Sequence, residues 1–190
     1  MVIGITGGIG SGKTYVSSIF EKLGFYIYNS DLEAKRLMSE NIKLVNSIKE
    51  LLGDVYTAGK YDPQKAMDDV LGSPEILRSL ENLIEPYLKK DFLDFLNKND
   101  RVLLESALLL NPTFSDFSNL CDIKVVITAP IDVRISRIKT RDMRTDQDIE
   151  RFLKIQMNDD DIIPLCDYQI VNDGRNDIEN EVRELIMKLF

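Results

Sequence analysis

A glycine-rich segment near the start of the chain constrains its fold more than any other feature. Residues 7–14 read G-G-I-G-S-G-K-T, a full match to the phosphate-binding pattern G-x-x-x-x-G-K-[ST]. An apolar run at residues 2–5 precedes it, and apolar residues at helical spacing follow between residues 16 and 23. Strand, glycine loop and helix form the setting that this motif needs. We therefore expect a nucleoside triphosphate site at the carboxyl end of a first strand.

The residues of this loop are expected to share the work of binding phosphate. Glycines permit positive φ angles, so that backbone N–H groups converge on one anion, and a helix beginning near Lys13 adds its positive end. Lys13 is expected to reach the β- and γ-phosphates, and the Thr14 hydroxyl to ligate Mg²⁺. Backbone N–H groups are the main contribution expected of Ser11 and Tyr15. The predicted nucleotide contacts are Gly10, Ser11, Gly12, Lys13, Thr14 and Tyr15.

Composition and charge exclude several other classes of protein. The 190 residues carry 24 basic and 32 acidic side chains, a net charge of −8, which argues against broad nucleic-acid binding. No apolar run is long enough to span a membrane, and the amino terminus lacks a signal-peptide pattern, so we expect a cytoplasmic protein without a membrane partner. The chain has no histidine and two cysteines, so any acid–base chemistry falls to a carboxylate.

The remaining chain alternates between strand and helix patterns, which predicts an α/β fold with a mostly parallel sheet. Ligands of such sheets bind at the carboxyl ends of the strands. A long helical stretch, about residues 32–99, is expected to form a lobe for a second substrate within one domain spanning residues 1–190. Further strands are predicted at 25–28, 101–105, 122–128 and 168–171, and helices at 32–52, at 74–97 with a kink or break at Pro86, and after residues 130, 145 and 176.

Two carboxylates follow predicted strands and are candidates for chemistry. Asp31 follows the second strand, where it is equally suited to accept a proton from an attacking hydroxyl or to cap the next helix. Glu105 ends the third strand, in the place of the acid that supports Mg²⁺ indirectly in phosphate-loop proteins. A solvent-facing strand terminus is the alternative for Glu105.

A basic stripe lies on the helix that is predicted after residue 130. Arg134, Arg137, Arg141 and Arg144 recur at three- or four-residue spacing. Such a stripe suits a lid, about residues 137–165, that closes over polyphosphate and neutralises charge in the transition state. The alternative is a solvated face that nearby aspartates offset.

The ordered set of motifs resembles the dephospho-coenzyme A kinase family. The opening I-T-G-G-I-G-S-G-K-T at residues 5–14 is similar to that family's first strand and loop, and Asp31 matches the second Asp of its D-A-D motif. Leu83–Pro86 resembles L-[LI]-H-P, and Leu108–Leu109 resembles the end of D-V-P-L-L. Arg141, Thr145 and Gln156 resemble the lid pattern, and residues 167–174 resemble A-D-x-x-I-x-N-x-G.

The resemblance implies a three-layer phosphate-loop NTPase fold with a helical acceptor lobe and a lid. It implies transfer of the ATP γ-phosphate to the ribose 3′-hydroxyl of dephospho-coenzyme A, the last step of coenzyme A synthesis. Asp31 would then be the general base, and Arg141 would contact the ATP phosphates. Another nucleoside or nucleotide kinase, or a nucleotide-regulated binding protein, remains the alternative, and the oligomeric state is open.

Five positions depart from the family pattern. Asn29 replaces the first Asp of D-A-D, Glu85 replaces the His of H-P, and Glu105 replaces the Asp of D-V-P-L-L. Asp159 and Ile162 replace basic residues that usually follow the lid glutamine. The last two changes bear on acceptor or phosphate contacts, whereas none of the five lies in the loop or at Asp31.

Overall fold

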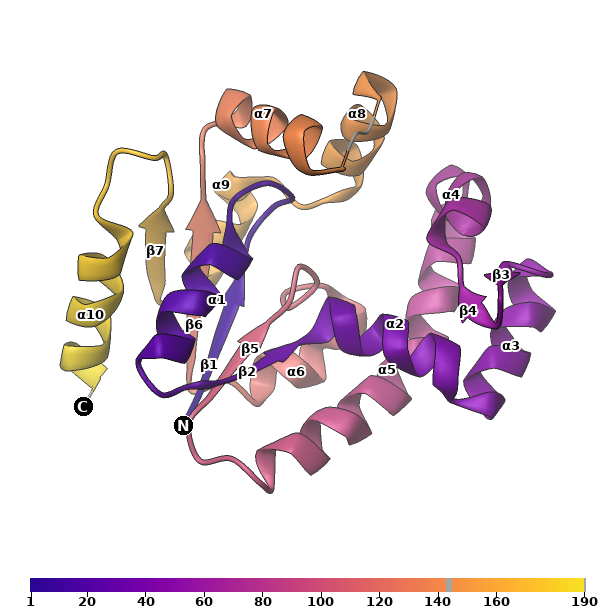
Figure 1. Ribbon diagram of the computed structural model, residues 1–190, viewed down its shortest axis with the longest axis horizontal. Helices are drawn as coiled ribbons and strands as arrows, with labels where there is room; N and C mark the ends of the chain where they lie inside the picture. The colour runs from indigo at the N-terminus through magenta and orange to yellow at the C-terminus, as the bar shows by residue number, and fades with distance from the viewer. Residues whose placement is uncertain (143–144, 190) are drawn as a thin grey trace.

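The computed structural model describes residues 1–142 and 145–189, with the backbone alone at residues 141, 142, 146, 152 and 155. In this part of the chain a parallel sheet of five strands has the order β2-β5-β1-β6-β7 (Figure 1). The α/β prediction and the predicted mostly parallel sheet are thus confirmed. The strands are β1 (Val2–Thr6), β2 (Tyr26–Asn29), β5 (Val102–Glu105), β6 (Ile123–Thr128) and β7 (Tyr168–Val171).

The central strand β1 carries the glycine loop out of the middle of the sheet. Ile5 pairs with Glu105 of β5 on one side and with Val125 of β6 on the other. Glu105 in turn pairs with Asn29 at the end of β2. This register brings the loop, Glu105 and the residues after β2 to one edge of the sheet.

Helices cover both faces of the sheet, which gives three layers. On one face α1 (Lys13–Lys22) and α10 (Ile178–Leu189) pack on a core that contains Ile3, Ile5 and Leu103. On the other face α5 (Pro74–Leu96) and α6 (Ser115–Asn119) pack over Val102 and Leu104, with a 3-10 turn at Pro112–Phe114. Because alternate residues of β5 serve different cores, both of its faces are buried.

The segment between β2 and β5 forms a helical lobe, and the helix predicted over 32–52 is in fact two helices. The chain breaks at Asn41, which has extended backbone angles, and its Oδ1 accepts from Leu44 N at 3.2 Å to cap the second helix. Asparagine favours such a cap over a helix interior. The lobe contains α2 (Ser30–Glu40), α3 (Ile42–Leu52), a small hairpin of β3 (Tyr56–Thr57) and β4 (Lys60–Tyr61), α4 (Pro63–Gly72) and α5.

Helix α5 continues through Pro86, so of the kink or break predicted there, the break is wrong. Ser73 caps its start, with Oγ accepting from Ile76 N at 3.3 Å. Proline removes one backbone hydrogen bond, while buried side chains on both sides of it, from Leu80 to Phe92, attach the helix to one core. This burial outweighs the local cost.

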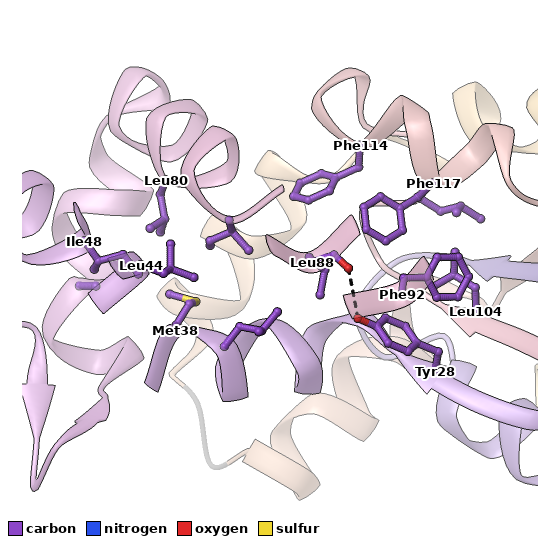
Figure 2. Packing of buried hydrophobic residues seen from close by; sticks show 14 of the residues in the cluster. Tyr28, Met38, Leu44, Ile48, Leu80, Leu88, Phe92, Leu104, Phe114 and Phe117 are labelled. Atoms are coloured by element: carbon purple, nitrogen blue, oxygen red, sulfur yellow. Dashed lines mark hydrogen bonds between the residues drawn. The ribbon is translucent and has the colours of Figure 1, made fainter. Parts of the chain in front are cut away.

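One hydrophobic core joins the lobe to the sheet (Figure 2). Phe92 is fully buried, with its ring centroid 4.8 Å from that of Tyr28 on β2 and 5.6 Å from that of Phe117 on α6. Tyr28 Oη donates to Asp91 Oδ2 at 2.9 Å and lies 3.4 Å from Leu88 O (Figure 2), which ties β2 to α5. The lobe is therefore packed against the sheet through side chains of three elements.

The chain after β6 covers the end of the sheet where the glycine loop lies (Figure 1). Thr145 Oγ1 accepts from Asp148 N at 3.2 Å, as expected for a capped helix start. Within the described residues, no helix is both long and apolar enough to cross a membrane. The elements here are α7 (Ile131–Asp142), α8 (Asp146–Ile155), α9 (Asp159–Ile162) and a 3-10 turn at Ile163–Leu165.

Candidate active site

The loop at residues 7–14 has the backbone that an anion cradle requires. Gly10 and Gly12 have φ angles of 79° and 94°, a region that favours glycine, and Gly12 leads directly into α1 at Lys13. The loop therefore delivers its N–H groups and the positive end of a ten-residue helix to one point.

Three side chains hold the outward-facing carbonyl groups of this loop. Arg134 Nε donates to Ile9 O at 2.9 Å, and Asn172 Nδ2 donates to Ser11 O at 2.9 Å. Arg137 Nη1 lies 3.3 Å from Ser11 O, and its Nη2 donates to Asn172 Oδ1 at 3.1 Å. Because N–H and C=O point in opposite directions across a peptide, fixing these carbonyls orients the N–H groups toward the anion.

The arginines of the predicted basic stripe therefore differ in what they contact. Arg134 is buried and braces the loop, and Arg137 both braces it and lines the cleft beside it. Arg141 lies in the last turn of α7, but its side chain, like the whole of Arg144, falls outside the described residues. The bracing role was missed from sequence, since a cation that binds backbone has no spacing signature.

The side chain of Lys13 folds back onto the glycine loop. Its Nζ donates to Gly7 O at 2.8 Å and lies 3.4 Å from Gly8 O. The Ser11 hydroxyl is buried and has no hydrogen-bond partner among the described residues. A cation and an unsatisfied hydroxyl at one loop both suit an incoming phosphate.

Glu105 connects the loop to the end of β5. Its Oε1 accepts from Thr14 Oγ1 and its Oε2 from Ser17 Oγ, both at 2.7 Å. The side chain is buried, so the alternative of a solvent-facing terminus is wrong. A carboxylate in this position fixes the rotamer of the Thr14 hydroxyl.

Asp31 lies at the start of α2, and the neighbouring residue takes the capping task. Asn29 Oδ1 accepts from Leu32 N at 3.0 Å, with extended backbone angles at Asn29. The alternative in which Asp31 is the helix cap is therefore wrong. The departure from the family's D-A-D motif at Asn29 supplies an ordinary N-cap residue.

The carboxyl of Asp31 opens onto the same cleft as the glycine loop. This phosphate cleft, of about 910 Å³, is lined by Lys13, Thr14, Asp31 and Glu105 among others. Desolvation raises the pKa of the Asp31 carboxyl, Lys13 opposes that rise, and the negative charge of Glu105 adds to it. The residue is exposed at the mouth of the cleft.

A second cavity, of about 510 Å³, lies between the helical lobe, the loop after β5 and the chain after α8. Ala107 and Gln156 line both the cavity and the phosphate cleft. Gln156 Oε1 accepts from Ile9 N at 2.7 Å, so its side chain stands where the two spaces meet. We call this space the side cavity.

The other three residues that depart from the family pattern lie in different parts of the structure. Asp159 pairs with Arg134 at 3.4 Å, and Ile162 is buried against the side cavity. Glu85 lies on α5 and lines neither the cleft nor the side cavity. The pair formed by Asp159 thus supports the brace on the loop.

Comparison with known proteins gives one consistent result. The model of the family described as CoaE, dephospho-CoA kinase, matches residues 1–177. A dephospho-CoA kinase from Bacteroides fragilis is 30% identical over 192 residues, covering 99% of this chain and 92% of that protein.

Two solved structures share the fold. The structure of TT1252 from Thermus thermophilus has a TM-score of 0.84 at 24% identity, covering 100% of this chain and 98% of that one. A dephospho-CoA kinase from Campylobacter jejuni has a TM-score of 0.60 at 22% identity, covering 98% and 96% of the two chains. These likenesses confirm the fold of the phosphate-loop kinases.

Proposed function

The chain belongs to the dephospho-CoA kinase family, and on this premise we propose that it transfers the ATP γ-phosphate to the ribose 3′-hydroxyl of dephospho-coenzyme A. One observation carries the assignment of the site. Asp31 lines the same cleft as Lys13 and Thr14, while Asn29 caps α2, in whose first turn Asp31 lies. A carboxylate that is not needed for capping is available for proton transfer.

The proposed reaction needs little covalent work from the protein. The Asp31 carboxylate accepts the proton of the acceptor hydroxyl as its oxygen attacks the γ-phosphorus. The bond from that phosphorus to the bridging β-oxygen breaks, and ADP leaves. Lys13 and the N–H groups of residues 10–15 stabilise the charge on the phosphate oxygens. The loop brace at Arg134 and Asn172 keeps those N–H groups in place before the substrate arrives.

The residues present also fit a Mg²⁺ ion. Thr14 offers a hydroxyl oxygen that Glu105 orients at 2.7 Å, and Mg²⁺ in such sites takes its other ligands mainly from phosphate and water. When bound, the ion would neutralise phosphate charge. Thr14 would hold it, and Glu105 would keep the Thr14 hydroxyl in position. Arg141 remains a proposed phosphate contact.

The setting of this activity is part of the proposal. We place the protein in the cytoplasm with ATP and dephospho-coenzyme A as small-molecule partners, and without nucleic acid or a membrane. The free thiols of Cys121 and Cys166 are compatible with a reducing compartment. Residues 1–190 would act as one domain, with a helical acceptor lobe at about 32–99 and a lid at about 137–165.

An acceptor panel tests the proposed reaction. The protein is incubated with ATP, Mg²⁺ and either dephospho-coenzyme A or a series of nucleosides and nucleoside monophosphates, and ADP and phosphorylated product are measured. Product from dephospho-coenzyme A alone is expected. Turnover only with a nucleoside monophosphate would support another kinase, and ATP binding without any transfer would support a nucleotide-regulated binding protein.

A further inference from the structure

The side cavity contains a buried carboxylate that phosphoryl transfer does not use. Glu81 lies on α5, is 6% exposed and lines this cavity. Leu80, next to it in the sequence, and Ile84, about one turn further along the helix, belong to the hydrophobic core. Burying a carboxylate costs free energy unless the group is hydrogen-bonded. The hydrogen-bond partners of Glu81 therefore indicate whether it can also accept hydrogen bonds from a ligand.

The amide of Asn111 is the neighbour of this carboxylate with measured hydrogen-bond distances. Asn111 Nδ2 lies 3.3 and 3.4 Å from its two oxygens, and both contacts are long. Asn111 is held in place because its Oδ1 accepts from Thr113 N at 2.9 Å. Burial raises the pKa of the Glu81 carboxyl, and hydrogen bonds from Asn111 and Thr113, together with the positive charge of Arg78, oppose the rise. Glu81 therefore keeps capacity to accept hydrogen bonds from a ligand.

The rest of the cavity wall limits the ligand class. Its described apolar residues are aliphatic, and none of the described lining residues is aromatic, so these residues offer no ring on which a base would stack. Arg78 and Lys154 also line it, and neither makes an ion pair within the described part of the chain. The wall therefore combines aliphatic surface, a hydrogen-bond acceptor and two cations.

The position of the cavity adds a geometric constraint. It meets the phosphate cleft at Ala107 and Gln156, and it reaches the back of the loop at Gly7 and Gly8. One extended molecule can therefore place a hydroxyl near Asp31 and still occupy the side cavity. Dephospho-coenzyme A has this form, because a diphosphate joins its ribose to an aliphatic arm with two amide groups.

We propose that the side cavity binds the aliphatic, amide-bearing arm of the acceptor, with Glu81 accepting an amide N–H and with Arg78 and Lys154 facing the diphosphate. This inference rests on the proposed function and specifies which end of the acceptor the helical lobe binds. The adenosine end then stays at the junction with the phosphate cleft. Glu81 is a specificity-determining residue in this arrangement.

Binding of two acceptor fragments tests the proposal. The full chain is saturated with a non-hydrolysable ATP analogue and titrated by calorimetry with 4′-phosphopantetheine or with AMP. Glu81→Met preserves the length of the side chain and removes the acceptor, so we expect about tenfold weaker binding of 4′-phosphopantetheine. AMP binding should not change. The KM for dephospho-coenzyme A should rise by a similar factor, with the KM for ATP unchanged.

A matched variant and a conservative variant complete the test. Glu75→Gln removes a charge from an exposed site on the same helix that does not line the cavity, and it should leave every constant unchanged. Glu81→Gln keeps one carbonyl acceptor and should recover part of the binding, and it replaces Glu81→Met in the test if the latter does not fold.

The outcomes separate this proposal from the proposed function. Weaker AMP binding with unchanged 4′-phosphopantetheine binding would place the adenosine end in the cavity and overturn the inference. Unchanged binding of both fragments would reduce Glu81 to a structural residue. If wild-type protein binds 4′-phosphopantetheine through Glu81 but phosphorylates no dephospho-coenzyme A, the proposed function fails and the cavity assignment stands.

Discussion

Asn29 and Asp31 divide two tasks at the end of β2. The amide of Asn29 caps α2, and the carboxyl of Asp31 opens onto the phosphate cleft. Sequence alone could not decide between these tasks for Asp31, because Asp serves equally well as a cap or as a base. The choice depends on where α2 begins. With Asn29 as the cap the helix begins at Ser30, whereas a cap at Asp31 would move the start by only two residues.

The variant Asp31→Asn should separate catalysis from binding. We expect kcat to fall by roughly 10²–10⁴ because the amide cannot take the proton, while the Kd for ATP stays nearly constant. Steady-state kinetics and calorimetric titration with ATP measure the two quantities. As a control, Asn29→Ala should lower the unfolding free energy by about 1 kcal/mol through loss of the cap. Unchanged turnover in Asp31→Asn would remove Asp31 from the mechanism.

The pKa of Asp31 is raised, and the direction of this shift can be tested by the pH dependence of activity and by the pH dependence of stability. The base must be ionised, so kcat/KM should fall as pH drops through a value above the ordinary range of Asp. A carboxyl with a raised folded-state pKa destabilises the fold once pH exceeds its unfolded pKa. Asp31→Asn should therefore raise the melting temperature at pH 7 and lose this advantage near pH 3. An acidic limb at the ordinary pKa of Asp would contradict the assignment.

At the scale of elements, α7 supports the glycine loop through Arg134 and Arg137. A Cβ on Gly10 would lie 2.7 Å from Arg134 O, and Gly10 has a φ of 79°. The sequence predicts the loop and its flanking strand and helix from local patterns. It does not predict the brace from Arg134, Arg137 and Asn172, because those contacts join segments more than a hundred residues apart.

Two glycine substitutions test how tightly this brace fits. Gly10→Ala should abolish measurable ATP binding, because the new methyl group meets both backbone strain and the α7 backbone. Gly72→Ala is the matched control at the end of α4, where a Cβ has open space. It should leave binding unchanged and stabilise the fold by up to about 1 kcal/mol. Calorimetric titration and thermal melts measure both effects, and retained binding in Gly10→Ala would contradict the brace.

At the scale of the whole molecule, the lobe and the sheet share one core. Leu80 on α5, Tyr28 on β2 and Phe117 on α6 belong to the same buried cluster. The succession of strands along the chain and the helical segment between β2 and β5 could be predicted from the sequence, since both follow from hydrophobic periodicity. Glu81 was missed, although a charge among apolar residues at helical spacing was visible in the sequence and is a usable signal.

The shared core predicts a single cooperative unfolding transition. Phe92→Ala should lower the unfolding free energy by about 3–5 kcal/mol, because a fully buried ring is lost between the lobe and the sheet. Far-ultraviolet circular dichroism follows the helices, and hydrogen exchange follows β1. Both should shift by the same amount. Loss of the lobe signal alone, with β1 still protected, would show two domains rather than one.

The position of β1 in the sheet also bears on how the protein folds. The first strand of the chain lies between β5 and β6, whose first residues are Val102 and Ile123. During synthesis β1 therefore waits for both of its neighbours until more than a hundred further residues have been made. Such distant pairings slow folding. The apolar residues of β1 are exposed during this interval, so a nascent-chain chaperone would matter for this strand.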